Sequence, residues 1–237
     1  MGIIKAVKLA FDYLKYDEDG NVQETQRAVD GVDIDIKEGQ FVAILGHNGS
    51  GKSTFAKHIN ALLLPSDGTI WIDGINTSEE PELWKVRQKA GMVFQNPDNQ
   101  IIGTVVEEDV GFGPENIGVP TDEIWQRVEE SLKAVGMLKY RHHSPNKLSG
   151  GQKQRIAISR TILKQAEIII FDDATSALDL KTEANLYSML KNAYPDTTKI
   201  IIAQRIASVK DADRIVILDD GHISAVGTHE ELLKNSA

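Results

Sequence analysis

The chain has no cysteine, few aromatic residues and no long apolar run. Without cysteine it forms no disulfide bond, offers no thiolate to a metal and has no cysteine nucleophile. No segment approaches the roughly 18 consecutive apolar residues that a membrane-spanning helix needs, and the N-terminus lacks the apolar core of a signal peptide. We therefore expect a protein that neither spans a membrane nor is exported, so that any role at a membrane requires a partner.

Positive charge is also scarce. The 237 residues include 26 lysines and arginines against 35 aspartates and glutamates, which gives a formal net charge of −9. Because nucleic-acid binding requires a basic face that neutralises phosphates, this balance argues against a nucleic-acid partner. The 41% of apolar and 26% of charged residues are typical of a globular protein. The length suits one large α/β domain, or a core with a subdomain.

The most informative segment that is present is the glycine-rich run from Gly46 to Thr54. An apolar strand is expected before it, at 40–45, and a helix after it, at 53–64. This order directs backbone N–H groups and the positive end of the helix dipole at one point, as in a phosphate-binding loop. Lys52 is expected to reach the β- and γ-phosphates, and Ser53 to ligate Mg²⁺. The predicted nucleotide contacts are His47, Asn48, Gly49, Ser50, Gly51, Lys52, Ser53 and Thr54.

Apolar patterning predicts strands alternating with helices along the rest of the chain. Alternation at 3–9 and 32–36, around a polar turn at 17–21, predicts an antiparallel hairpin. Further strands are expected at 69–72, 91–94, 168–171, 199–203 and 214–218, and helices at 122–135, 151–164, 182–192 and 230–234. From about 96 to 147, helical periodicity alternates with loops containing proline and glycine, which predicts a helical insertion.

A second candidate anion site begins at Leu148, where the sequence reads Leu-Ser-Gly-Gly-Gln. A serine and two glycines before a helix place a hydroxyl and free N–H groups where phosphate oxygens bind, although the same pattern also makes an ordinary helix N-cap. The residues concerned are Ser149, Gly150, Gly151 and Gln152. An apolar run that ends in Asp172 follows them.

The order of these motifs, with Gln95 between the first two, resembles that of the ATP-binding cassette (ABC) proteins, and nearly the whole chain is similar to the nucleotide-binding subunit of an ABC transporter. The resemblance implies an α/β P-loop NTPase: a RecA-like core with an antiparallel β edge region (1–95 and 155–237) and a helical ABC subdomain (96–154). It also implies ATP and Mg²⁺ as ligands, with a second nucleotide-binding subunit and transmembrane transporter subunits as partners. Nucleic acid is not among them. The chain is then expected in the cytoplasm, held at the membrane by those subunits.

The resemblance also implies roles for single residues. Asp172 matches the Walker B aspartate, which holds Mg²⁺ through water. Gln95 matches the Q-loop glutamine, which senses the γ-phosphate, belongs to the metal and catalytic site, and links the core to the helical subdomain. The signature segment Leu148–Gln152 is expected to contact ATP bound to the partner subunit, so that each site is shared between two chains.

Aromatic residues leave two questions open. An aromatic side chain near the N-terminus stacks on adenine in this family; we assign Tyr13, with Phe11 or Tyr16 as the alternative. The other interpretation is that Tyr13 is an ordinary aromatic residue of the core. Trp84 and Trp125 are expected to pack helices, or else to belong to the groove on which a membrane subunit docks.

Two positions depart from the family pattern, and both bear on hydrolysis. Asp173 stands where a glutamate usually polarises the attacking water, and Gln204 stands where a histidine usually contacts the γ-phosphate. Displacing a positioned group by about an ångström costs on the order of 10²-fold in rate, and glutamine cannot carry positive charge. We expect ATP binding to survive and hydrolysis to be slow, with Asp173, Gln204 and Gln95 as the catalytic residues. The alternative is that aspartate and glutamine suffice for turnover.

The two parts of the chain resemble different branches of the family. Residues 1 to about 155 resemble the ATPase subunits of energy-coupling factor (ECF) importers, and residues from about 156 onward resemble the degenerate subunit of heterodimeric ABC exporters. This contrast suggests a recombination of two ABC ATPases, the alternative being a divergent natural subfamily. A recombined or regulatory module would bind ATP with little hydrolysis and no transport role of its own.

Overall fold

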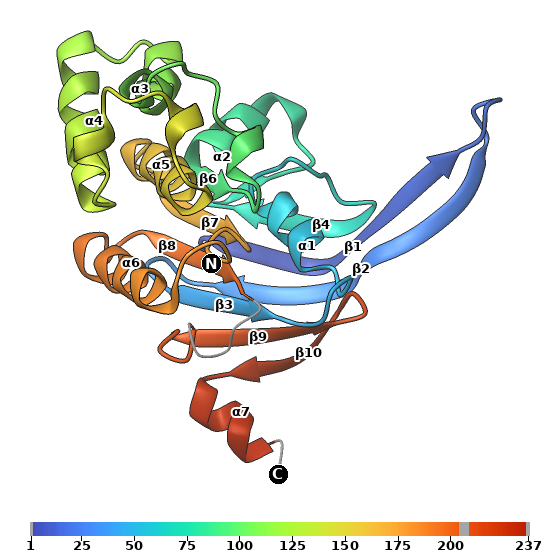
Figure 1. Cartoon of the computed structure of the whole chain (residues 1–237). Helices are drawn as coiled ribbons and strands as arrows, with labels where there is room; N and C mark the ends of the chain where they lie inside the picture. Colours follow the sequence, from blue (N-terminus) through green and yellow to red (C-terminus); the bar gives the residue numbers. More distant parts are fainter. Residues whose placement is uncertain (1, 204–208, 236–237) are drawn as a thin grey trace.

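Two β-sheets form the frame of the molecule in the computed structural model, which describes residues 2–203 and 209–235 (Figure 1). The first is antiparallel, with the order β2-β1-β4-β5. Its strands are β1 (Ile4–Tyr16), β2 (Val22–Ile36), β4 (Asp67–Ile72) and β5 (Ile75–Asn76). The second has the order β10-β9-β3-β8-β7-β6. Its strands are β3 (Phe41–Leu45), β6 (Ala90–Val93), β7 (Ile168–Asp172), β8 (Thr198–Ile202), β9 (Arg214–Asp219) and β10 (His222–Gly227).

The second sheet is parallel except at its β10 edge, and side chains cover both of its faces. Successive residues of β7 alternate between two hydrophobic clusters: Ile169 and Phe171 pack on one side, Ile168 and Ile170 on the other. This two-sided burial is why the strand is a continuous apolar run. Because the carboxyl ends of parallel strands meet at one edge, β3 and β7 deliver the loops that follow them to the same place.

The helices are α1 (Lys52–Ile59), α2 (Leu83–Lys89), α3 (Val106–Asn116), α4 (Thr121–Ala134), α5 (Gly150–Leu163), α6 (Leu180–Ala193) and α7 (His229–Asn235). Helices α3, α4 and α5 lie together at one side of the parallel sheet (Figure 1). The buried face of α4 holds Ile124, Val128 and Leu132, as the sequence pattern predicts. No helix among the described residues is both long and apolar enough to cross a membrane.

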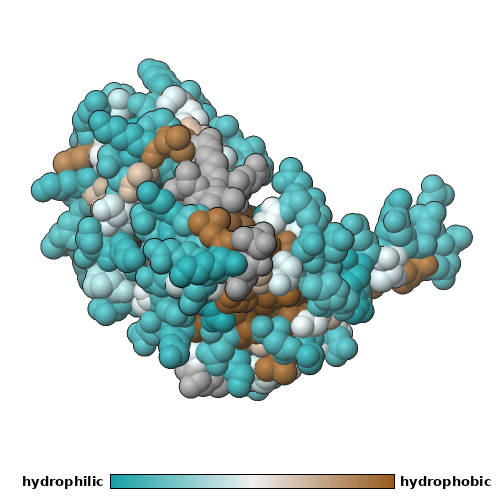
Figure 2. Space-filling view, turned by 90° about the horizontal axis from the view of Figure 1, so that it is seen from below, coloured by the Kyte–Doolittle hydropathy of each residue, from teal (hydrophilic) through white to brown (hydrophobic). Residues whose placement is uncertain are grey.

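The predicted N-terminal hairpin is confirmed, but its strands run much further than the apolar pattern suggests. β1 pairs with β4 only as far as Ala10, and beyond this point it pairs with β2 alone. The two strands therefore leave the body of the molecule as an arm (Figure 1). Seen from below, hydrophobic residues gather along the middle of the molecule and at a spot on the arm, while most of the rest is hydrophilic (Figure 2).

Three features of local structure differ from what the residue patterns suggest. Helix α1 ends at Ile59 rather than at residue 64, because Ala61 adopts a left-handed conformation (φ 53°) that a helix cannot continue through. Trp84 and Trp125 are 55% and 39% exposed, so neither is fully buried, although Trp125 lies close to Gly111 of α3. Strand β10 was not expected, because its solvent-facing residues leave too weak an apolar alternation to see in the sequence.

Candidate functional site

The glycine-rich loop connects the end of β3 to the start of α1, where its glycines let three backbone segments approach closely. A Cβ on Gly46 would lie 2.1 Å from the Leu218 carbonyl oxygen, and one on Gly51 would lie 2.2 Å from the Ala28 carbonyl oxygen. Gly51 has φ 95° and forms the N-cap of α1 without a side-chain cap. The first N–H groups of α1 are therefore left for an anion, as a phosphate-binding loop requires.

The Lys52 ammonium lies inside this loop. Its Nζ donates hydrogen bonds to the carbonyl oxygens of Gly46, at 3.0 Å, and His47, at 2.7 Å. The side chain is only 8% exposed, and this burial lowers the Lys52 pKa, against the opposing effect of Asp173 and Asp172 nearby. A positive charge held by backbone carbonyls at a helix N-terminus suits the binding of an anionic phosphate chain.

A pair of oxygen ligands lies next to the lysine. Ser53 donates a hydrogen bond to Asp172 Oδ1 at 2.6 Å, across 119 residues of sequence. Asp172 is the last residue of β7 and is 7% exposed. A hydroxyl and a carboxylate beside a phosphate cradle are the donors that Mg²⁺ prefers, so the residues fit the predicted metal.

Asp173 follows Asp172 at the sheet edge and faces the Q-loop. Gln95 Nε2 donates to Asp173 Oδ2 at 3.0 Å. Asp173 has φ 50°, a left-handed conformation that is uncommon outside glycine, asparagine and aspartate. Its N–H donates to the Ile202 carbonyl at 3.2 Å, which ties the turn to β8. Such local strain is characteristic of a functional turn.

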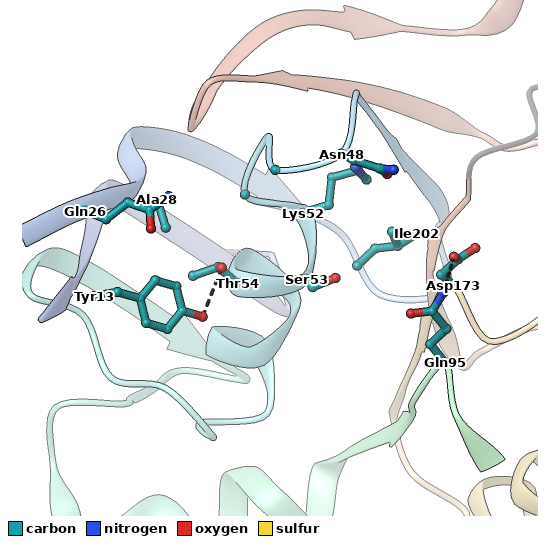
Figure 3. Close-up of a pocket in the computed structure, with 12 residues that line it drawn as sticks. Tyr13, Gln26, Ala28, Asn48, Lys52, Ser53, Thr54, Gln95, Asp173 and Ile202 are labelled. Atoms are coloured by element: carbon teal, nitrogen blue, oxygen red, sulfur yellow. Dashed lines mark hydrogen bonds between the residues drawn. The ribbon is translucent and has the colours of Figure 1, made fainter. Parts of the chain in front are cut away.

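These groups surround one cavity of about 430 Å³ (Figure 3). The predicted residues among its lining are Tyr13, Asn48, Gly49, Gly51, Lys52, Ser53, Thr54, Gln95 and Asp173. Tyr13 projects from β1 at one end, and its hydroxyl lies 3.2 Å from Thr54 Oγ1. Three further residues line the cavity that the sequence did not suggest: Gln26, Ala28 and Ile202. Strand pairing offers a signal for Gln26, because it lies opposite Tyr13 in the hairpin.

Other predicted residues lie elsewhere. Ser50 is fully buried and does not line the cavity. His47 is also outside its lining; its Nε2 lies 3.1 Å from Asp219 Oδ1 and 3.2 Å from Asp220 Oδ1. A hydrogen bond to the Asn48 carbonyl, together with these carboxylates, raises the His47 pKa. Gln204 lies outside the described residues.

The signature segment forms the N-terminus of α5. Ser149 caps the helix: Gln152 N donates to Ser149 Oγ at 3.4 Å, and Ser149 N donates to Gln152 Oε1 at 2.8 Å. Both readings of the motif, cap and anion site, remain compatible with this geometry. Neither these residues nor Gly150 and Gly151 line the cavity of their own chain. An ATP contact by this segment therefore requires a second chain.

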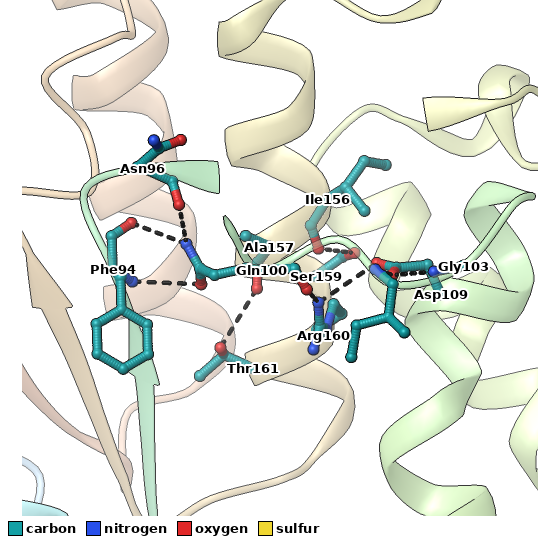
Figure 4. Close-up of polar contacts among 11 residues, drawn as sticks. Phe94, Asn96, Gln100, Gly103, Asp109, Ile156, Ala157, Ser159, Arg160 and Thr161 are labelled. Carbon is teal, nitrogen blue, oxygen red and sulfur yellow. Dashed lines mark hydrogen bonds and ion pairs between the residues drawn. The ribbon is translucent and has the colours of Figure 1, made fainter. Parts of the chain in front are cut away.

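A polar network links the loop after Gln95 to helix α5 (Figure 4). Gln100 donates to the carbonyl oxygens of Phe94 and Asn96, both at 3.0 Å. Arg160 of α5 donates to the Gln100 carbonyl and lies 3.5 Å from Asp109 of α3, which is 1% exposed. Asp109 is buried in this ion pair while the Arg160 side chain is 28% exposed, and together with the hydrogen bonds of Gln100 the pair connects this segment to the helix that begins with the signature.

Comparison with known proteins supports the reading of these motifs. The model of the ABC transporter family matches residues 29–176. The chain is 48% identical to the energy-coupling factor transporter ATP-binding protein EcfA1 of Clostridium novyi (strain NT), over 98% of this chain and 82% of that protein. It is 43% identical to EcfA1 of Listeria innocua serovar 6a, over 97% and 81%.

Solved structures agree. The dimeric ATP-binding cassette MJ0796, in a post-hydrolysis state with ADP and phosphate, matches with a TM-score of 0.85 and 33% identity, over 95% of this chain and 98% of that one. CbiO1 from Clostridium perfringens, part of the ABC transporter complex CbiONQ, matches with a TM-score of 0.85 and 32% identity, over 99% and 92%. The P-loop NTPase fold is therefore confirmed.

The comparisons do not support the recombination hypothesis or an exporter-like C-terminal part. The match to the Clostridium novyi protein runs over 98% of the chain, so one natural family accounts for both halves. Likeness to an Atm1-family exporter likewise covers 99% of the chain instead of its second half alone. The chain belongs to the ABC transporter family, as one of its ATP-binding subunits, which hydrolyse ATP.

Proposed function

We propose that the chain is the ATPase subunit of an energy-coupling factor transporter, which binds ATP and Mg²⁺ in the cavity behind the glycine-rich loop. The observation that carries the proposal is the convergence of phosphate-binding, metal-binding and water-orienting groups on one cavity. Support for the transporter class comes from relatives that are energy-coupling factor ATP-binding proteins. In this reading the chain is peripheral to the cytoplasmic face of the membrane through its partner subunits.

Each group has a separate task in hydrolysis. Lys52 and the N-terminus of α1 bind the β- and γ-phosphates, while Ser53 and Asp172 hold Mg²⁺, with Gln95 beside them. The metal, when bound, neutralises charge on the phosphates. Asp173 orients a water whose oxygen attacks the γ-phosphorus. The bond from the γ-phosphorus to the bridging oxygen breaks, ADP leaves with the electron pair, and the proton of the water passes to the carboxylate.

A second nucleotide-binding subunit, either another copy or a homologue, completes the site. Ser149, Gly150, Gly151 and Gln152 contact the ATP of the partner, because they do not line the cavity of their own chain. Similar cassettes are dimeric in solved structures.

Hydrolysis is slow in this proposal. The Asp173 carboxylate reaches one methylene less far than glutamate, and Gln204 brings no positive charge to the γ-phosphate. The same two residues favour one alternative: the chain acts as the regulatory half of a heterodimer, binding ATP and offering its signature to a partner with a complete catalytic pair.

The membrane partner is assigned to a groove beside the helical region. A cavity of about 290 Å³ opens between β6, α3 and α5, with Met92, Val110 and Ile117 in its wall. Trp84 and Trp125 are exposed aromatic side chains on α2 and α4. Each of these helices also contributes a residue to the wall of the cavity, Gln88 and Arg127. Exposed large apolar side chains of this kind mark protein–protein contact sites.

Release of inorganic phosphate from ATP tests the activity, and co-purification tests the partner. We expect Mg²⁺-dependent phosphate release that EDTA abolishes. When co-expressed with the membrane subunit of the energy-coupling factor transporter from the same organism, the chain is expected to co-purify with it, and Trp84→Ser with Trp125→Ser to reduce recovery. Undiminished recovery of the double variant contradicts the assigned groove, while absence of phosphate release contradicts the activity.

A further inference from the structure

His58 is a buried polar residue in α1 that the hydrolysis chemistry does not use. It is fully buried, and its Nδ1 lies 2.7 Å from the backbone carbonyl oxygen of Thr54. Because a carbonyl oxygen only accepts hydrogen bonds, Nδ1 carries the proton. Nε2 of the ring is buried without a hydrogen-bond partner. A buried polar atom left unsatisfied is costly, so the position of this ring calls for a compensating role.

The imidazole ring of His58 belongs to a closed loop of contacts among four residues, one of which lines the nucleotide cavity. Its centroid lies 5.0 Å from that of Phe11, at an interplanar angle of 73°. Phe11 contacts Tyr13 in the same edge-to-face manner, at 4.9 Å and 85°. The Tyr13 hydroxyl then lies 3.2 Å from Thr54 Oγ1, which returns to the residue that His58 contacts. We call these four residues, His58, Phe11, Tyr13 and Thr54, the His58 cluster.

The location of the His58 cluster shows that it holds Tyr13 in place. Beyond Ala10, β1 pairs only with β2, so Tyr13 stands at the base of the projecting arm. Tyr13 is 41% exposed and lines the cavity. Its contacts to Phe11 and Thr54 attach it to α1, the helix that follows the phosphate-binding loop. Tyr13 on β1 and the phosphate-binding loop are thus both connected to α1.

We propose that His58 is a positioning residue for the nucleotide base: through Phe11 and Thr54 it holds the Tyr13 ring ready to contact the base of ATP. The inference rests on the proposed function in one respect, the contact of Tyr13 with the base. A side chain that is already ordered loses less conformational entropy when the ligand binds. The effect of His58 is therefore expected on the affinity of the base and not on that of the phosphate chain.

Two ligands separate these effects, namely ATP and inorganic tripolyphosphate, which has the phosphates but no base. We expect His58→Leu to raise the Kd of ATP roughly 3- to 10-fold, the range that loss of an aromatic edge contact predicts, and to leave the Kd of tripolyphosphate unchanged. Phe11→Leu, which alters the same set of contacts without a change in α1, is expected to act likewise. Lys57→Ala, on the same helix but outside the His58 cluster, is the control and should change neither Kd.

A double-mutant cycle shows whether His58 acts through Tyr13. In the Tyr13→Ala background, His58→Leu and Phe11→Leu should weaken ATP binding no further. Equal weakening of ATP and tripolyphosphate, or the same weakening with and without Tyr13, overturns the positioning role. If Tyr13→Ala itself leaves the Kd of ATP unchanged, the base contact assigned under the proposed function fails and the inference fails with it. Loss of ATP affinity in Tyr13→Ala but not in the other two variants overturns the inference alone.

Discussion

At the residue scale, Asp173 is the group on which the rate of hydrolysis depends in the proposed mechanism. It lies between Gln95, which donates to its carboxylate, and the end of β8, which accepts from its N–H. The backbone is fixed at φ 50°, so the reach of the side chain decides where the carboxylate lies. An aspartate here has one methylene less than a glutamate, so we expect its carboxylate to reach less far into the cavity.

We expect Asp173→Glu to raise kcat about 10-fold or more, since a misplacement of about an ångström costs on the order of 10²-fold. Asp173→Asn, which keeps the size but removes the negative charge, should lower kcat below the wild-type value. Both variants should bind ATP as the wild type does. Steady-state phosphate release measures kcat for the wild type, for Asp173→Glu and for Asp173→Glu combined with Gln204→His. A wild type that turns over several times per second, with no gain in the double variant, contradicts the expected slow hydrolysis.

The sequence was sufficient to assign residues to the phosphates and the metal, but it did not suggest all of the residues that complete the cavity. Lys52, Ser53 and Asp172 belong to motifs whose chemistry dictates the residue type, so they stand out without a structure. Ala28 and Ile202 line the cavity through their position in β2 and at the end of β8. Nothing in an alanine or an isoleucine signals such a role, because their contribution is shape set by strand pairing.

At the element scale, helix α5 joins two functions. Its N-terminus holds the signature, and its body reaches the loop after Gln95 through Arg160. Gly151 lies where a Cβ would be 3.3 Å from the Ala177 carbonyl oxygen, so α5 also packs closely on the segment that follows Asp173. In the proposed dimer, the start of this helix would therefore contact both its own chain and the ATP of the partner.

Ser149→Ala tests the capping box at the start of α5. Loss of an N-cap hydroxyl costs about 1 kcal/mol of helix stability, and the variant removes a hydroxyl assigned to the ATP of the partner. We expect phosphate release to fall about 10-fold or more while the single chain binds ATP unchanged. Comparing kcat with the Kd of ATP measures the two effects; a Kd that rises in parallel with the loss of rate would show that Ser149 acts within its own chain.

Elements with strong apolar periodicity were predictable, and those defined by backbone conformation were not. The buried strand β7 and the amphipathic helix α4 follow directly from residue patterns. The early end of α1 depends on the left-handed Ala61, for which alanine gives no signal. The length of the arm depends on pairing between β1 and β2. It was not predictable, because the exposed residues of the arm show little apolar alternation.

At the scale of the whole molecule, the burial of His58 makes stability depend on pH. Desolvation lowers the His58 pKa below its ordinary value of 6.5 and outweighs the opposing effect of the Thr54 carbonyl oxygen. The folded protein therefore binds this proton less readily than the unfolded chain does. Stability from this residue is fully present above pH 6.5 and falls as the pH drops below it.

Urea denaturation at pH 7.5 and 5.5 checks this prediction. We expect the free energy of unfolding to fall between the two values by more in the wild type than in His58→Leu, since the variant has no proton to bind at this site. His143→Leu, at an exposed histidine, is the matched control and should show the wild-type difference. The same pH dependence in wild type and His58→Leu would mean that His58 is not the group responsible.

The whole molecule is built as half of a nucleotide site. Lys52, Ser53 and Asp173 line one cavity, with Asp172 hydrogen-bonded to Ser53 behind it, while the signature segment of the same chain does not line it. The sequence predicted this division from the family resemblance, and the geometry is compatible with a second subunit that supplies the other half.

Titration of the purified chain with ATP and Mg²⁺ tests the central claim most directly, with Lys52→Ala compared against Lys57→Ala. The Lys52 ammonium lies within the loop at 2.7 Å from a backbone carbonyl, whereas Lys57 lies further along α1 and outside the cavity lining. We predict that Lys52→Ala weakens ATP binding by about 10-fold or more, as loss of a charge-assisted contact implies, and that Lys57→Ala binds like the wild type. A Lys52→Ala chain that binds ATP with unchanged affinity would contradict the assignment of this cavity as the ATP site.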